Sequence, residues 1–189
     1  MRQKLFALTE LNHLRLEAVQ LFEQCLTQGD LLPMMEFIEK QIVYTPPRLQ
    51  LLRDITDDLQ QRLLSLKEYH FDVRERVVTT LEESYHVNLT TLAPQAKLDR
   101  YHHLSQDEII AHVQAQNPSL NEKDLALIRK LVDASLQMAA QLHNDIQLTT
   151  QLFNLVLDWT EGMSVTLARE QWPNTAQSPS EGTDTTKHH

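Results

Sequence analysis

The sequence predicts an all-α protein. We expect an elongated antiparallel helical hairpin or bundle with two long helices and, in addition, shorter N-terminal helices. The chain of 189 residues contains only three glycines, and leucine, glutamine and glutamate are abundant. This composition favours helices because few positions interrupt them. Two long stretches also place apolar residues at steps of three and four, the period of one helix face. We therefore expect residues 47–86 to run antiparallel to residues 119–165.

The N-terminal segments predict two shorter helices. Leucines recur at helical spacing over residues 2–28, and Gly29 is placed to end that helix in the left-handed conformation. Asp30 can cap a second helix over residues 31–43, whose first turn tolerates Pro33.

The first long helix is predicted from Pro47 to about His86. Thr45 can be its N-cap and Pro46 its first residue, because the first turn leaves the N–H that proline lacks unbonded anyway. About 40 residues at 1.5 Å each predict a rod of roughly 60 Å. The apolar seam of this helix follows steps of three and four: Leu52, Ile55, Leu59, Leu63, Leu66, His70, Val73, Val77 and Leu81.

A connector over residues 88–104 separates this helix from the rest. The pair Ser105–Glu108 matches a capping box and predicts a short helix over residues 105–115. The pair Ser119–Glu122 matches a second capping box, so we expect the last and longest helix over residues 119–167.

The C-terminal end has a different composition. Residues 173–189 contain almost nothing to bury, and we expect a disordered tail that follows a single helical domain over residues 1–172. The closing pair His188–His189 is typical of an affinity-tag remnant, and we exclude it from function.

The charge balance excludes several classes of partner. Seventeen basic against 26 acidic residues give a net charge of −9, without a basic cluster. Phosphate groups are bound by lysine and arginine, so we expect neither nucleic acid nor an anionic membrane surface as partner. The single Cys25 excludes an internal disulfide and fits a reducing cytosol. No apolar stretch is long enough for a signal peptide or a membrane span, so we expect a cytoplasmic protein without membrane insertion.

The residues offer little catalytic chemistry. Glu83-x-x-His86 has the spacing of a helical di-iron site, but such a site needs two such pairs together with two further glutamates, all facing inward. No glycine-rich phosphate loop and no nucleophile elbow is present. We therefore predict no enzyme, no cofactor and no metal ligands, and a helical-bundle metalloprotein is kept as the weaker alternative.

A second apolar line on the last helix carries the strongest functional signal. It lies roughly opposite the first apolar line of that helix, so the helix must bury two faces. One interpretation is a partner-binding surface that captures a helix. The alternatives are a homodimer interface and a face covered by the N-terminal helix of the same chain. The predicted partner-binding residues are Leu148, Leu152, Leu155, Trp159 and Met163.

Several segments together resemble a known family. LFEQCLTQGDLLPMMEFIEKQ, residues 21–41, resembles the early signature of FlgN- and FliT-type flagellar export chaperones. LSQDEIIAHV, residues 104–113, is similar to the short helix that follows the first long helix in FlgN. LHNDIQLTTQLFNLVL, residues 142–157, resembles the leucine-rich segment with which sequences of the family end. The chain departs from the family in its Thr-Pro-Pro break at 45–47 and in a longer connector at 88–104.

The resemblance implies a specific function. Such chaperones are cytosolic, have no enzymatic activity and need no cofactor. They bind the C-terminal helices of the hook–filament junction proteins, keep them unassembled and deliver them to the type III export gate. A self-associating helical scaffold, or a regulatory adaptor without catalytic activity, is the alternative function.

Overall fold

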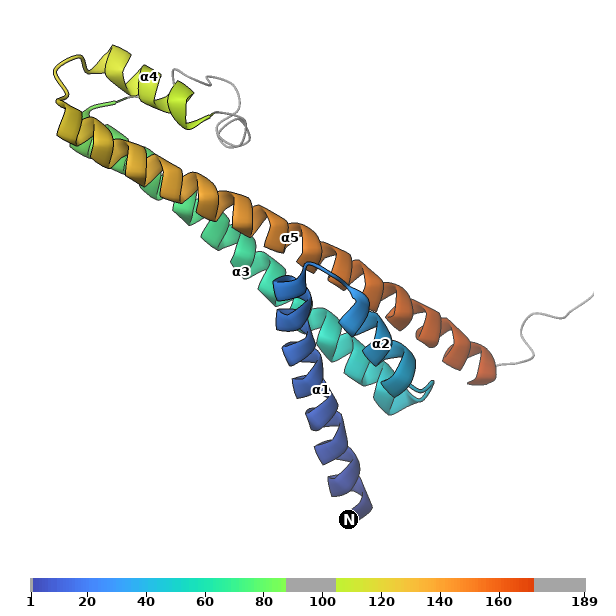
Figure 1. Cartoon of the computed structure of the whole chain (residues 1–189). Helices are drawn as coiled ribbons and strands as arrows, with labels where there is room; N and C mark the ends of the chain where they lie inside the picture. The colour runs from blue at the N-terminus through green and yellow to red at the C-terminus, as the bar shows by residue number, and fades with distance from the viewer. Residues whose placement is uncertain (1, 88–104, 172–189) are drawn as a thin grey trace, which may run out of the picture.

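The computed structural model describes residues 2–87 and 105–171, and these residues form helices without any strand (Figure 1). The predicted all-α class is therefore confirmed for the described part of the chain. The helices are α1 (Arg2–Gln28), α2 (Leu32–Gln41), α3 (Pro46–Tyr85), α4 (Gln106–Gln116) and α5 (Glu122–Gln171). The predicted connector at 88–104 and the predicted tail at 173–189 lie outside the described residues.

The two long helices, α3 and α5, lie side by side and run antiparallel (Figure 1). Buried and half-buried residues follow each helix in alternating steps of four and three, which is a seven-residue repeat. A seven-residue repeat keeps one side of a helix facing its neighbour over many turns, as in a coiled coil. On α3 these positions are Leu52, Thr56, Leu59, Leu63, Leu66, His70, Val73 and Val77; on α5 they are Ile128, Val132, Ser135, Ala139, Leu142, Ile146, Thr149, Phe153, Val156, Thr160 and Met163.

The buried threonines on this seam satisfy their hydroxyl hydrogen bonds within their own helices. The Thr56 hydroxyl donates to the Leu52 carbonyl at 2.8 Å, and the Thr160 hydroxyl donates to the Val156 carbonyl at 2.7 Å. The two hydroxyl oxygens lie 3.5 Å apart across the seam. Threonine is therefore accepted in the interior because no buried hydroxyl is left without a partner.

Two separate hydrophobic cores stabilise the two ends of the hairpin. The first core contains residues of α1, α2, the first turns of α3 and the last third of α5. The second core joins the end of α3 to α4 and the start of α5, with Leu81, Val113 and Ile128 fully buried. Between them α3 has no buried residue over positions 60–72. The middle of the molecule is therefore a two-helix rod without a core of its own.

Three ion pairs connect α1 to α3. The Arg15 guanidinium donates to both carboxylate oxygens of Asp58, at 2.8 and 2.6 Å. The other two pairs are Arg48–Glu10 at 2.6 Å and Arg62–Glu23 at 2.7 Å. All three are partly exposed, and exposed pairs contribute at most about 1 kcal/mol each. The ion pairs fix the direction of α1, while apolar burial supplies most of its attachment.

Several helix ends agree with the expected capping. Ser105 and Glu108 form the predicted capping box, and hydrogen bonds from the Ser105 backbone N–H and hydroxyl lower the pKa of the Glu108 carboxyl. Thr45 occupies the N-cap position of α3, but its hydroxyl makes no capping hydrogen bond. Pro46 and Pro47 hold the first two helical positions and lack the N–H groups that a cap would receive.

The predicted start of the last helix is wrong by three residues. α5 begins at Glu122, and the side-chain oxygen of Asn121 accepts the Asp124 backbone N–H at 2.9 Å. Asn121 is therefore the residue that caps the helix. Ser119 lies two residues before this cap, and its hydroxyl instead donates to the side-chain oxygen of Asn117 at 2.6 Å.

Two helices end in the left-handed conformation, at Gly29 with φ 69° and at His86 with φ 54°. A residue with a side chain costs roughly 1–2 kcal/mol in this conformation.

We expect Gly29→Ala to lower the free energy of unfolding by about 1 kcal/mol, because open space around Gly29 leaves backbone strain as the main effect. The matched change His86→Gly should not destabilise the protein, because it relieves the same strain. Urea unfolding measures both, and equal destabilisation by the two changes would contradict this account.

Candidate partner-binding surface

The five predicted partner-binding residues lie along the C-terminal half of α5, but they do not share one environment. Leu152 is 1% exposed and Met163 is 0% exposed, and both belong to the first hydrophobic core. Leu148, Leu155 and Trp159 are half-buried. The strip is therefore divided along its length into a covered edge and an open edge.

Helix geometry explains the division. At 100° per residue, Leu148, Leu155 and Trp159 lie within about 40° of one another around α5. Leu152 and Met163 lie about 50° further round, toward the seam with α3. A strip this wide can pack against a core on one side and still reach solvent on the other. We call the half-buried residues Leu148, Leu155 and Trp159 the open edge of α5.

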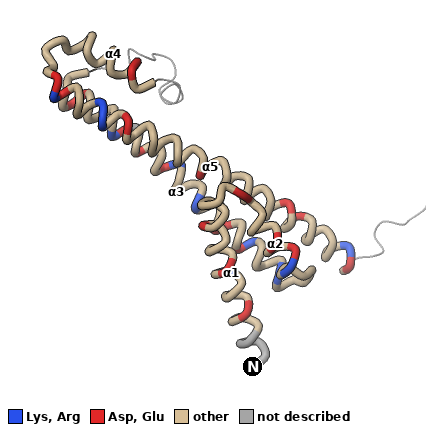
Figure 2. The backbone as a smooth tube through the Cα atoms, in the orientation of Figure 1, with Lys and Arg blue, Asp and Glu red and all other residues tan. Residues whose placement is uncertain are grey.

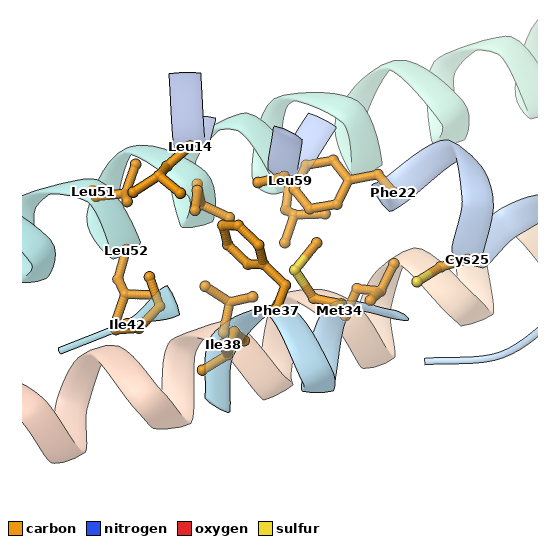
Figure 3. Close-up of a cluster of buried hydrophobic side chains, with 14 of the residues drawn as sticks. Leu14, Phe22, Cys25, Met34, Phe37, Ile38, Ile42, Leu51, Leu52 and Leu59 are labelled. Carbon is orange, nitrogen blue, oxygen red and sulfur yellow. The ribbon is translucent and has the colours of Figure 1, made fainter. Parts of the chain in front are cut away.

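The helix α2 contributes to the core in which the covered edge is buried. Its buried residues Met34, Phe37 and Ile38 belong to the same core as Leu152 and Met163. Figure 3 shows these three side chains between the ribbons of α3 and α5. The sequence left open whether the N-terminal part of the chain covers the strip. The structure buries Leu152 and Met163 in a core to which α1, α2 and α3 all contribute, and it leaves the other three residues partly accessible.

The open edge continues from the core without a break. Leu155 and Trp159 pack against the first core. Leu148 lines a groove of about 440 Å³ between the C-terminal end of α1, at Leu26 and Gly29, and α5. The groove wall on α5 is mostly amide side chains: Gln141, Asn144, Gln147 and Gln151. The edge thus offers apolar contact flanked by hydrogen-bonding groups.

The charged residues of α5 near the open edge are all acidic. α5 contains no lysine or arginine between Lys130 and Arg169, whereas Asp145 and Asp158 lie near the edge on the same helix. Figure 2 shows this stretch of α5 with acidic positions only. A partner without acidic residues at the contact is therefore favoured, since like charges would repel.

One apolar face was missed by the sequence reasoning. Leu8, Leu16 and Val19 on α1 are 58%, 64% and 41% exposed. The sequence does contain a signal for this face, which is the width of the apolar stripe on α1. A contact with one neighbouring helix covers only part of the helix circumference, so a wide stripe leaves some apolar residues exposed.

The described residues contain no group of three or more histidine, cysteine, aspartate or glutamate side chains that could hold a metal ion. His86 of the Glu83-x-x-His86 motif is the left-handed C-cap residue of α3 and not part of its helical face. Cys25 is buried, and burial raises the pKa of its thiol, which makes it less reactive. In the same described part of the chain, no helix is apolar enough over a sufficient length to cross a bilayer.

The division of the strip can be measured as a difference in stability. Met163→Ala removes a fully buried side chain and should lower the free energy of unfolding by about 2–5 kcal/mol. Leu148→Ala removes a half-buried side chain beside an open groove and should cost less than about 1.5 kcal/mol. Urea unfolding of both variants tests this expectation. Similar losses would show that the strip is not divided.

Comparison of the chain with family models, with curated proteins and with solved structures finds no match.

Proposed function

We propose that the chain is a cytoplasmic, non-enzymatic export chaperone of the flagellar type III system. In this proposal it binds the C-terminal helices of hook–filament junction proteins, keeps them unassembled and delivers them to the export gate. The observation that carries the proposal is the open edge of α5, where Leu155 and Trp159 extend the first core to the surface and Leu148 lines the groove beside α1. The resemblance of residues 21–41, 104–113 and 142–157 to FlgN- and FliT-type chaperones supplies the client class.

The geometry suits the capture of a helix. Steps of seven and four place Leu148, Leu155 and Trp159 along about three turns of one helix side. An amphipathic client helix that lies along this side would bury its own apolar face, which would otherwise drive premature assembly. The amide side chains near Leu148 can bond polar groups of the client, beside the Asp145 carboxylate that lines the same groove.

The fold keeps the binding edge in a fixed shape. Leu152 and Met163 anchor the same helix in the core, so α5 does not have to fold or reorder when a client binds. A surface that is already ordered loses less conformational entropy on binding, which raises the affinity that a small contact can reach.

The alternative function, a self-associating scaffold or regulatory adaptor, is favoured by a different observation. The exposed leucines on α1 offer a second apolar surface remote from the open edge. Such a surface serves self-association as well as client binding, and the two functions are compatible on one chain.

The proposed function predicts a defined loss of binding. Tryptophan is the residue most often found at binding hot spots, and truncating one typically costs about 2 kcal/mol or more. Trp159→Ala should therefore weaken binding to a peptide of a hook–filament junction protein's C-terminal helix by roughly 30-fold or more. Titration calorimetry with the full chain measures the affinity, and circular dichroism checks that the variant is folded at the assay temperature.

The matched control is Leu64→Ala, which removes a 49% exposed leucine from α3. This change should leave the affinity unchanged. Absence of binding by the unmodified chain, or equal losses in both variants, would contradict the proposed function.

A further inference from the structure

A groove beside the open edge of α5 contains a negative charge that the fold does not neutralise. The groove, of about 440 Å³, lies between the C-terminal end of α1 and α5, and the half-buried Asp145 is one of its lining residues. The Asp145 carboxylate accepts a hydrogen bond from the neutral amide of Gln141 at 3.0 Å. Among the ion pairs of the described residues, none brings a lysine or arginine to this carboxylate. The charge of Asp145 is therefore available to a ligand in the groove.

The end of α1 adds to this negative potential. α1 ends at Gln28. The next two N–H groups, those of Gly29 and Asp30, both bond to the Cys25 carbonyl, at 2.8 and 3.2 Å. The carbonyls of residues 26–28 receive neither of them, and the last turn of a helix has no intrahelical partner to offer. Residues 26–28 line the groove, and carbonyls at a helix C-terminus carry a partial negative charge. Both walls of the groove thus favour a cation.

The protein supplies no cation of its own to these walls. The sequence contains no lysine or arginine over residues 16–39, which include the end of α1, or over residues 131–168, which include the groove wall on α5. Both stretches contain acidic residues. Among the described residues, none of α3 lines the groove. A positive group in the groove therefore has to come from another molecule.

Binding of a client helix along the open edge makes the charge of Asp145 decisive. Asp145 lies three residues before Leu148, which is about 4.5 Å along the axis of α5. A helix about 10 Å wide that contacts Leu148 therefore also covers the mouth of the groove. A carboxylate that loses water without gaining an opposite charge destabilises the complex, whereas a hydrogen-bonded cation offsets that loss. The affinity of a client thus depends on the group that it places in the groove.

The groove fits an arginine side chain better than a metal ion. Calcium is bound by about six to eight oxygen ligands, usually with several carboxylates. Among the described lining residues, only Asp145 has a carboxylate, and most of its neighbours are amides. An arginine has five N–H donors, which match a carboxylate together with amide and main-chain carbonyl oxygens. Its aliphatic stem can lie against Leu26 and Leu148, which line the same groove.

We propose that the groove receives an arginine side chain of the client helix, with the guanidinium bonded to Asp145 and the stem against Leu148. The inference rests on the proposed function for the identity of the client, and it adds a requirement on the client's sequence. The open edge from Leu148 to Trp159 contacts the apolar face of the client over about 17 Å. The arginine therefore lies about one turn beyond one end of that apolar face.

Two designed peptides test this requirement without a natural client. Both are amphipathic helices with leucines along three turns of one face, and both have two variable positions, one turn beyond each end of the leucines. One peptide carries arginine at these positions. The other carries citrulline, which has the same length and a similar planar end group but no charge. Titration calorimetry with the full chain should give an affinity about tenfold higher for the arginine peptide, corresponding to about 1.4 kcal/mol.

Variants of the chain assign the preference to one carboxylate. Asp145→Asn keeps the shape of the side chain and removes its charge, so it should reduce the preference to about twofold or less. Asp145→Lys should reverse it, because two cations repel each other in the groove.

Asp133→Asn is the matched control. Asp133 also accepts a hydrogen bond from a glutamine one turn away, Gln137, at 3.1 Å. It is not among the lining residues of the groove, and it lies about 18 Å from Asp145 along α5, beyond the range of an exposed charge at physiological salt. This variant should keep the tenfold preference of the unmodified chain.

The outcomes separate this inference from the proposed function. Equal affinities for the two designed peptides, no binding of either, or equal effects of Asp145→Asn and Asp133→Asn would overturn the inference. A peptide of a hook–filament junction protein's C-terminal helix tests the function itself, because it has to bind the unmodified chain. Binding of that peptide, without a preference between the designed pair, would leave the proposed function standing and remove the inference alone.

Discussion

The seven-residue repeat on the seam between α3 and α5 is the constraint on which the rest of the structure depends. It holds the two helices together along the 40 residues of α3, which fixes the molecule as a rod. Small and polar seam residues such as Thr56, Ala139 and Thr160 allow close approach but bury little apolar area. The seam therefore determines the shape, while most of the stability has to come from the elements that pack on its two ends.

This arrangement explains why the last helix serves both the fold and the proposed binding site. At one end α1 and α2 add a second layer over the hairpin, and they take Leu152 and Met163 into the core. The layer is narrower than the apolar strip, so Leu148, Leu155 and Trp159 remain at its border. Edge residues of a rigid core are suited to binding because they are apolar, ordered and accessible at the same time.

The helices could be predicted from the sequence because their signals are local: apolar periodicity, Gly29 as a stop and the Ser105–Glu108 box as a start. The start of α5 could not, because Ser119 and Asn121 are both residue types that cap helices, and only the structure shows that Asn121 accepts the Asp124 N–H. The strip on α5 was found as a whole, but its division depends on where α2 docks, which is a tertiary contact. That Leu8, Leu16 and Val19 on α1 stay exposed was missed for the same reason.

The central claim is that a client helix binds the open edge of α5 while the core beneath it stays intact. Methyl NMR of the full chain, titrated with a C-terminal helix peptide from a hook–filament junction protein, tests this most directly. The account predicts shifts of the Leu148 and Leu155 methyl signals, with the signals of Ile38 and Leu59 in the core little changed. Large shifts at Ile38 and Leu59 would show that the client displaces α2, and unchanged Leu148 and Leu155 signals would show that the edge is not the binding site; either result would contradict the account.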